Sequence, residues 1–134
     1  MSNNLAHLIG IPFVDGGRDP KKGLDCWGLL MQASREFGYK VPDYNICAFC
    51  SPDIWEKYKV ETGRLWRKVK SPTPGCVLAF ATDPEMPDAV CHFGIYIGRG
   101  QFLHTLKKSS SILSRLDHFY WRNKLRGIYE WAGE

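Results

Sequence analysis

Apolar residues recur at helical intervals in the first half of the chain, and an alternation typical of strands replaces them after about residue 63. From Leu29 onward, apolar side chains three or four residues apart predict a helix over 25–37. A Ser-Pro pair opens a second expected helix over 51–60, with the serine as its N-cap. The N-terminal part is expected to form a short helix over 3–9, followed by a loop over 10–23.

Strand-like segments follow one another in the second half, separated by turns rich in glycine and proline. The expected strands are 66–69, 76–81, 90–97, 101–106, 112–115 and 127–131. A tight Gly-Arg-Gly turn at 98–100 makes the third and fourth of them a hairpin, and a helical turn is expected over 117–124. This order predicts an α+β fold, with N-terminal helices packed on an antiparallel sheet.

The length and composition fit one domain over residues 1–134. The net charge of +4 comes from short, scattered groups of Lys and Arg, so we expect no nucleic-acid partner. No apolar run approaches about 18 residues, so no membrane partner is expected. The first residues lack a basic region followed by an apolar run, which predicts synthesis in the cytoplasm without a signal peptide. The five cysteines, an odd number, are expected to remain free thiols.

Cys26 stands where a glycine-containing loop gives way to the first expected helix. A thiol at a helix N-terminus lies near unpaired backbone N–H groups, which lower its pKa and can hold the oxyanion of a tetrahedral intermediate. Gly28, two residues further on, would let a substrate backbone approach closely. Cys26 is therefore the candidate nucleophile, with a pKa expected to lie below that of a free thiol.

Two histidines are expected to lie side by side on the hairpin. The tight turn places Ile97 opposite Gln101, and this register pairs His104 near Gly94. His92 lies two residues before Gly94, so its side chain falls on the same face of the sheet. A thiol nucleophile needs an imidazole base that is oriented by another polar group. His92 is thus the candidate base, and His104 is the candidate residue that orients its ring.

Three motifs resemble those of the NlpC-type cell-wall cysteine peptidases, a papain-like superfamily. They are GLDCWGL at 23–29, HFGIYIG at 92–98 and FLHT at 102–105, and they stand in the order that the family shows. Each motif alone has little specificity, but the ordered set is specific. The resemblance implies the papain-like NlpC fold over most of the chain.

The resemblance also implies roles for individual residues. Cys26 takes the place of the nucleophile, His92 of the base and His104 of the orienting residue. Four residues near the cysteine are expected to contact substrate: Phe13, Asp25, Trp27 and Gly28. Phe13 stands where many relatives carry a tyrosine, so a hydrogen bond from that hydroxyl is lost, and Asp25 is equally suited to capping the helix.

The activity that the resemblance implies is hydrolysis of an amide in peptidoglycan stem peptides, often the bond from D-glutamate to a diamino acid. No metal and no other cofactor are implied. The Cys-Trp pair and the small size are most similar to members found in phage and prophage tails. Stem peptides and other tail proteins are therefore the expected partners, and a phage tail is the expected location.

Two other functions remain open from the sequence. The chain could be a non-catalytic structural or binding component of a tail tip, or a thiol acyl or amide transferase on the same fold. Cys47 and Cys50 have the spacing of zinc ligands. A structural zinc site needs a second matching pair, which the sequence does not offer, so no metal site is expected.

Overall fold

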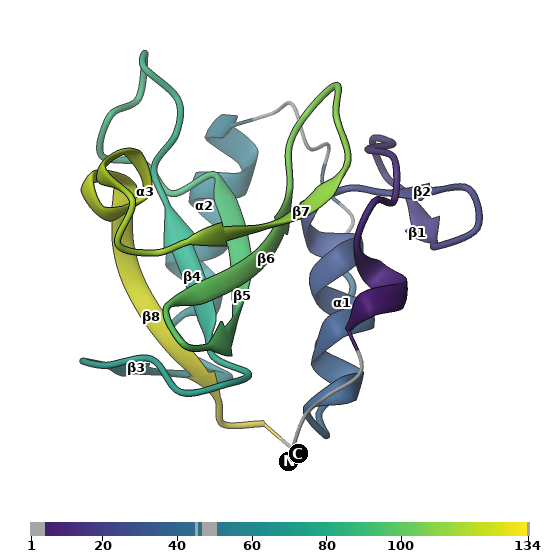
Figure 1. The fold of residues 1–134 in the computed structure, drawn as a ribbon. Helices are drawn as coiled ribbons and strands as arrows, with labels where there is room; N and C mark the ends of the chain where they lie inside the picture. The colour runs from purple at the N-terminus through teal and green to yellow at the C-terminus, as the bar shows by residue number, and fades with distance from the viewer. Residues whose placement is uncertain (1–4, 45, 47–50, 134) are drawn as a thin grey trace.

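The computed structural model of the chain describes residues 5–44, 46 and 51–133. A six-stranded antiparallel sheet lies at its centre, with two helices against one face and a third helix against the other (Figure 1). This is the α+β fold that the sequence predicts. None of the described helices is both long enough and apolar enough to cross a membrane.

The strands of the central sheet lie in the order β3-β8-β4-β5-β6-β7, and every neighbouring pair is antiparallel. Their bounds are Trp66–Val69 (β3), Val77–Phe80 (β4), His92–Gly98 (β5), Gln101–Thr105 (β6), Ser111–Arg115 (β7) and Leu125–Trp131 (β8). All six strands expected from the sequence are confirmed, with small shifts at their ends. The insertion of β8 between β3 and β4 joins distant segments, which a local pattern does not reveal.

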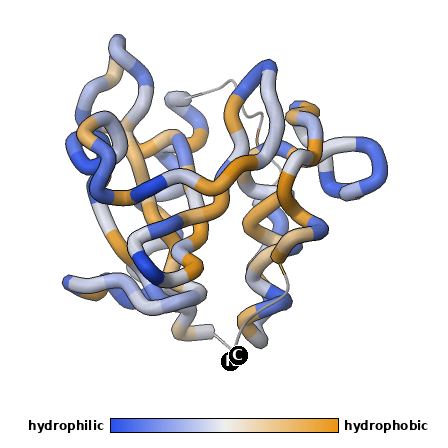
Figure 2. Tube along the Cα trace, in the orientation of Figure 1, coloured by the Kyte–Doolittle hydropathy of each residue, from blue (hydrophilic) through white to orange (hydrophobic). Residues whose placement is uncertain are grey.

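The two faces of the sheet carry separate apolar cores, and the hydrophobic stretches concentrate on the central strands and on α1 (Figure 2). Leu29 and Ala33 of α1 (Cys26–Glu36) pack against Ile95 of β5 and Leu103 of β6. These residues recur four apart on the helix and have the same parity on the strands, so each element buries one face. The expected first helix is confirmed, and its packing fixes the position of its N-terminus beside β5.

The remaining helices cover the rest of the sheet. They are η1 (Ala6–Leu8), which is a 3-10 helix, α2 (Ser51–Glu61) and α3 (Phe119–Lys124). Tyr58 of α2 packs over Tyr129 on the same face as α1, whereas Trp121 of α3 packs over Phe102 on the opposite face. The expected helical turn near residue 120 is confirmed, and its tryptophan closes the second core.

The loop expected over 10–23 is more ordered than its composition indicates. It contains a two-stranded antiparallel ribbon, β1 (Arg18–Asp19) and β2 (Gly23–Leu24). The strands are too short for an alternating pattern, so the sequence could not predict them. The pairing of β1 with β2 provides hydrogen bonds for backbone N–H and C=O groups of this segment, which lies against the start of α1.

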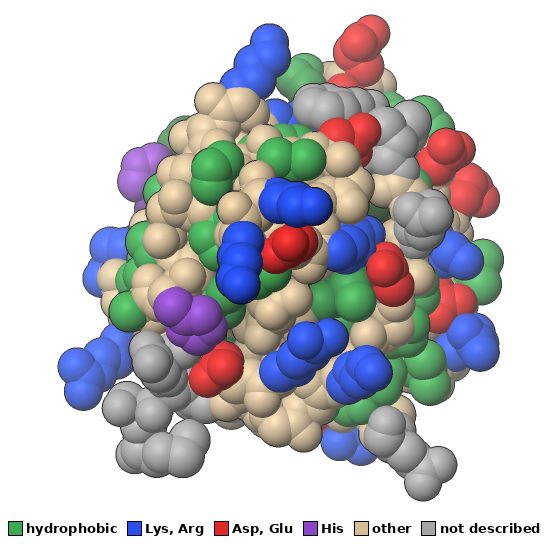
Figure 3. Space-filling model, turned by 90° about the vertical axis from the view of Figure 1, so that its right-hand side faces the viewer, with side chains coloured by type: hydrophobic (Ala, Val, Ile, Leu, Met, Phe, Trp, Pro, Cys, Tyr) green, Lys and Arg blue, Asp and Glu red, His purple; other side chains and the backbone are tan. Residues whose placement is uncertain are grey.

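Charged side chains of both signs are interspersed on the face of the molecule that Figure 3 shows. Arg18 with Asp43 and Arg115 with Asp117 are examples of exposed or half-exposed ion pairs among the described residues. On this face, the net positive charge is therefore not gathered into one basic patch.

Candidate active site

The residue before Cys26 caps the helix that Cys26 begins. The Asp25 carboxylate accepts hydrogen bonds from the Gly28 N–H at 2.8 Å and from the Gly16 N–H at 3.1 Å. It thereby satisfies one of the first-turn N–H groups, which have no partner inside the helix. The capping role suggested for Asp25 is confirmed, and a substrate contact by Asp25 stays a prediction.

An arginine from the β1–β2 ribbon offsets the charge of this buried cap. Arg18 Nη1 lies 2.6 Å from the Asp25 carboxylate, and Arg18 Nε lies 3.0 Å from that of Asp43. The same Nη1 donates to the Gly17 carbonyl at 2.9 Å. Because Asp25 is only 2% exposed, its charge requires such a partner. Arg18 was not predicted as a site residue, because it lies in the expected loop and outside the three motifs.

The structure shows a packing role for Gly28, and the substrate contact expected of it stays a prediction. A Cβ at this position would lie 2.1 Å from the Gly17 carbonyl oxygen, a distance that no side chain tolerates. The close approach that glycine permits is thus made by a loop of the same chain. The absence of a side chain at Gly28 lets the loop over residues 14–17 fold against the start of α1.

The two histidines meet as the hairpin register predicts. Nε2 of His92 lies 2.8 Å from Nδ1 of His104, and both side chains are buried. The ladder pairs Ile95 with Leu103, which sets His104 opposite Gly94 as expected. Next to the turn the expectation was wrong, because Gly98 rather than Ile97 faces Gln101, across an irregularity in the ladder.

Two further side chains hold this histidine pair. Nε2 of His104 lies 2.8 Å from the Ser114 hydroxyl of β7, and the Trp121 indole contacts both rings. The hydrogen-bonded series therefore runs from His92 through His104 to Ser114. Neither Ser114 nor Trp121 was predicted as a site residue. The sequence predicts a strand over 112–115, which contains Ser114. No local pattern shows which strand pairs with it, so the contact with His104 could not be predicted.

Cys26 and His92 line the same cavity, whose volume is about 300 Å³. Its other lining residues are Phe13, Thr82, Cys91, Thr105, Leu106, Lys107, Tyr120 and Trp121. The structure thus brings together Cys26 at the start of α1, His92 at the start of β5 and Phe13 from the N-terminal segment. Cys26 is half-buried, and the backbone N–H groups of Phe93 and Trp27 act to lower its pKa.

The expected low pKa of the thiol is not found. Burial, with the charge of the neighbouring Asp25 carboxylate second, raises the pKa of Cys26 to about 12. The Phe93 N–H, the Lys107 charge and the Trp27 N–H act in the opposite direction but are outweighed. The helix terminus that the sequence analysis relied on is present, but desolvation of the thiolate dominates. The resting nucleophile is therefore a neutral thiol.

The histidines also rest in the neutral form. Burial, with the charge of Lys107 second, lowers the pKa of His92 to about 4. Burial and then the neighbouring His92 ring lower the pKa of His104 to about 2. A neutral imidazole beside a neutral thiol can accept the proton of that thiol as the sulfur attacks, so the pair is suited to general-base activation.

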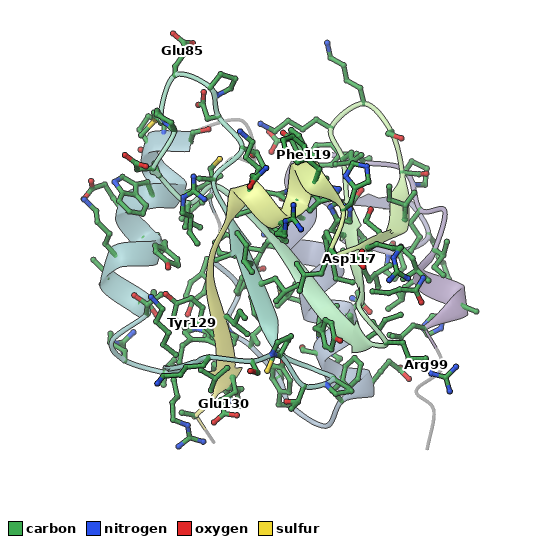
Figure 4. The ribbon with its side chains drawn as sticks, turned by 60° about the vertical axis from the view of Figure 1, so that its left-hand side comes forward. Glu85, Arg99, Asp117, Phe119, Tyr129 and Glu130 are labelled. Atoms are coloured by element: carbon green, nitrogen blue, oxygen red, sulfur yellow. The ribbon has the colours of Figure 1, made fainter. Side chains whose placement is uncertain are left out.

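A second, apolar cavity opens on the other side of Cys26. Trp27 lines it, and its indole N–H donates to the Pro42 carbonyl at 2.8 Å, which fixes the ring. Tyr58 from α2 and Tyr129 from β8 also line it, and their hydroxyl groups are hydrogen-bonded to each other. Tyr129 is labelled in Figure 4. The cavity holds about 70 Å³, enough for a small apolar group. The substrate contacts expected of Trp27 and Phe13 stay predictions, and the two residues lie in different cavities that share Cys26.

Within the described residues, no group of three or more His, Cys, Asp or Glu side chains is arranged to hold a metal ion. The described cysteines Cys26, Cys76 and Cys91 are free thiols. The zinc-like spacing of Cys47 and Cys50 lies outside the described residues.

Several curated proteins resemble the chain over most of its length. It is 30% identical over 123 residues to the murein DD-endopeptidase MepS/murein LD-carboxypeptidase of Escherichia coli K12, covering 91% of the chain and 56% of the relative. It is 28% identical to the gamma-DL-glutamyl hydrolase of Bacillus subtilis, covering 90% of the chain and 26% of the relative. A gamma-D-glutamyl-L-lysine dipeptidyl-peptidase of the same species is 30% identical over 80% of the chain and 31% of the relative. The chain thus spans between about a quarter and just over half of these proteins.

Solved structures share the fold. NlpC2 from Trichomonas vaginalis superposes with a TM-score of 0.68 at 20% identity, covering 94% of the chain and 45% of that structure. The NlpC/p60 domain of the peptidoglycan hydrolase SagA superposes with a TM-score of 0.58 at 22% identity, covering 94% of each. The model of the NlpC/P60 family matches residues 10–130. With this match over most of its length, the chain belongs to the NlpC/P60 family.

Proposed function

We propose that the chain is a cysteine hydrolase that cleaves an amide bond in the stem peptides of bacterial peptidoglycan. One observation carries the proposal: the Cys26 thiol and the His92 ring line one cavity, and His92 is hydrogen-bonded to His104. The names of the relatives support the substrate class, since they include a murein endopeptidase, a gamma-glutamyl hydrolase and a gamma-glutamyl dipeptidyl-peptidase. A non-catalytic scaffold would not need a nucleophile, a base and an orienting residue together.

The reaction begins from the neutral pair. As the Cys26 sulfur attacks the scissile carbonyl carbon, its proton passes to His92. The Cys26 N–H at the start of α1 is the donor assigned to the oxyanion, because the Gly28 and Leu29 N–H groups are already bonded to Asp25. His92 then gives its proton to the leaving amine, which departs and leaves a thioester on Cys26. Water attacks the thioester with His92 as base, which releases the acid and restores the thiol.

The hydrogen-bonded series determines where the protons lie. When His92 carries the thiol proton, both of its ring nitrogens are donors, so its Nε2–H donates to Nδ1 of His104. His104 must then carry its own proton on Nε2 and donate it to the Ser114 hydroxyl. His104 acts in this scheme by orienting the His92 ring and fixing its tautomer.

The bond from the γ-carboxyl of D-glutamate to the diamino acid is the proposed target. Two of the relatives are named for gamma-glutamyl bonds, whereas the E. coli relative is named for DD- and LD-bonds. The association with a phage tail and the cytoplasmic synthesis without a signal peptide stay predictions from the sequence.

Digestion of purified peptidoglycan tests the proposal. The wild-type protein is expected to release new stem-peptide fragments, whose masses identify the bond, and Cys26→Ala is expected to release none. Cys76→Ala is the matched control, because it removes a buried thiol that does not line the cavity of Cys26 and His92. Equal release by wild type and Cys26→Ala, or no release from several wall types, would contradict the proposal.

A further inference from the structure

A lysine stands beside the catalytic pair and has no role in the reaction described above. Lys107 follows β6 and lines the cavity together with Cys26 and His92. The side chain is exposed, so its charge can meet a ligand that enters from solvent. Its field reaches both catalytic groups, since it lowers the pKa of each of them. A cation in this place attracts an anionic group of a substrate.

A residue that lines the same cavity carries a buried hydroxyl without a hydrogen-bond partner among the described residues. Thr105, the last residue of β6, lines the cavity and is 1% exposed, and its Oγ1 has no hydrogen-bond partner among the described residues. Leaving a buried hydroxyl unpaired costs free energy, so such groups in native proteins call for an explanation. A ligand that accepts a hydrogen bond from this hydroxyl would supply one.

In the part of the chain that the structure describes, the opposite wall of the active site offers no free carboxylate near the thiol that would compete with an anionic ligand for Lys107. The nearest buried carboxylate to the thiol, Asp25, is held by Arg18 and by the Gly28 N–H. The cavity that contains Trp27 is mainly aromatic and lies on the other side of Cys26. The two sides of the thiol therefore differ in chemistry, one apolar and the other with a cation and a free donor.

We propose that Thr105 and Lys107 form a subsite for a carboxylate that lies next to the scissile carbonyl of the substrate. This proposal rests on the proposed function. In a peptide linked through the γ-carboxyl of glutamate, the α-carboxylate stays free and lies a few bonds from the scissile amide. Lys107 supplies the charge, and the Thr105 hydroxyl donates a hydrogen bond to one oxygen. The subsite would select peptides with this free carboxylate over peptides in which it is amidated.

Two peptides that differ only at this carboxylate test the subsite. One carries the free α-carboxylate on its γ-linked D-glutamate, and the other carries the α-carboxamide. Wild type is expected to prefer the carboxylate by about tenfold in kcat/KM, the size expected of one charge-assisted hydrogen bond. Lys107→Gln should reduce that ratio to near one. The ratio is insensitive to any change in thiol reactivity, because that change acts on both peptides.

Lys108→Gln is the matched control, since Lys108 is an exposed neighbour that does not line the cavity. It should keep the wild-type ratio. Thr105→Val removes the hydroxyl with little change of volume and should reduce the ratio severalfold without lowering stability, because the hydroxyl has no partner to lose. An unchanged ratio in Lys107→Gln, or an equal loss in Lys108→Gln, would overturn the proposal.

Alkylation of Cys26 separates a failure of the subsite from a failure of the proposed function. The anionic reagent iodoacetate and the neutral reagent iodoacetamide attack the same thiol, so the ratio of their rates reports the local charge. Lys107→Gln should lower this ratio by about fivefold at low salt, and Lys108→Gln should lower it little. If the wild type cleaves neither peptide but the alkylation ratio falls as expected, the anion subsite stands and the proposed substrate is wrong. An alkylation ratio that does not respond to Lys107 would refute the subsite itself.

Discussion

Acidification is expected to destabilise the fold well above the pH at which carboxylates titrate, because His92 and His104 are buried as neutral rings. The pKa of each ring is lowered, to about 4 for His92 and about 2 for His104, whereas an unfolded histidine titrates near 6.5. Between these values the unfolded chain binds more protons than the folded protein. Stability is therefore fully present above the unfolded pKa and falls as the pH drops below about 6.5.

The magnitude follows from the same pKa values. At about pH 5, an unfolded histidine is almost fully protonated and each buried ring remains neutral. Each ring therefore lowers the free energy of unfolding by about 2 kcal/mol relative to its value at about pH 7.5. The two rings together account for a loss of about 4 kcal/mol in the free energy of unfolding. This is an upper figure, because local opening lets a ring take up its proton without unfolding of the whole domain. That is a large share of the 5–15 kcal/mol typical of a folded domain.

Urea unfolding followed by tryptophan fluorescence at several pH values measures this effect, since the chain has five tryptophans. The double variant His92→Gln with His104→Asn should lose most of the pH dependence, although its stability at neutral pH is lower. His7→Gln, at an exposed position, should keep it. A wild-type stability that is unchanged between about pH 7.5 and pH 5, or a double variant with the full dependence, would refute the reasoning.

Three other predictions follow from the site. Asp25→Ala should destabilise the protein by about 2 kcal/mol or more, because it removes the helix cap and leaves Arg18 without its partner; Asp25→Asn should cost less in urea unfolding. Ser114→Val should lower kcat by about tenfold, whereas Ser114→Thr has the same shape as the valine variant but keeps the acceptor for His104, so it should stay near wild type; equal rates in both variants would contradict the hydrogen-bonded series. Alkylation of Cys26 by iodoacetamide should accelerate about tenfold per pH unit through pH 9, since burial raises the pKa of this thiol to about 12, and a plateau near neutral pH would contradict that pKa.

Local patterns were enough to predict the parts of the site that single elements build. The helix that Cys26 begins follows from its apolar spacing, and the capping by Asp25 follows from its place before that helix. The pairing of His92 with His104 follows from the period of two along the strands. The predicted register near the histidines was correct although the pairing at the turn was not. The strand segment from Tyr96 to Gly98 contains one extra residue, and this restores the predicted pairing from Tyr96 back toward His92.

Contacts between distant segments could not be predicted in this way. Ser114 reaches His104 only because β7 pairs with β6, and Trp121 covers both rings only because α3 packs on the second face of the sheet. Arg18 meets Asp25 through a ribbon too short to leave a pattern. The pKa of Cys26 was mispredicted for a related reason, since the helix terminus is a local feature and the burial that outweighs it comes from the tertiary fold.

Activity measured against the fraction of Cys26 that is alkylated tests directly whether this thiol is the nucleophile. Samples of the wild-type protein are modified with iodoacetamide for increasing times, peptide mapping quantifies the label on each cysteine, and release of stem-peptide fragments is measured for each sample. Activity is expected to fall in proportion to the label on Cys26 and to reach zero when Cys26 is fully modified. Activity that persists with Cys26 fully modified would contradict this role of the thiol.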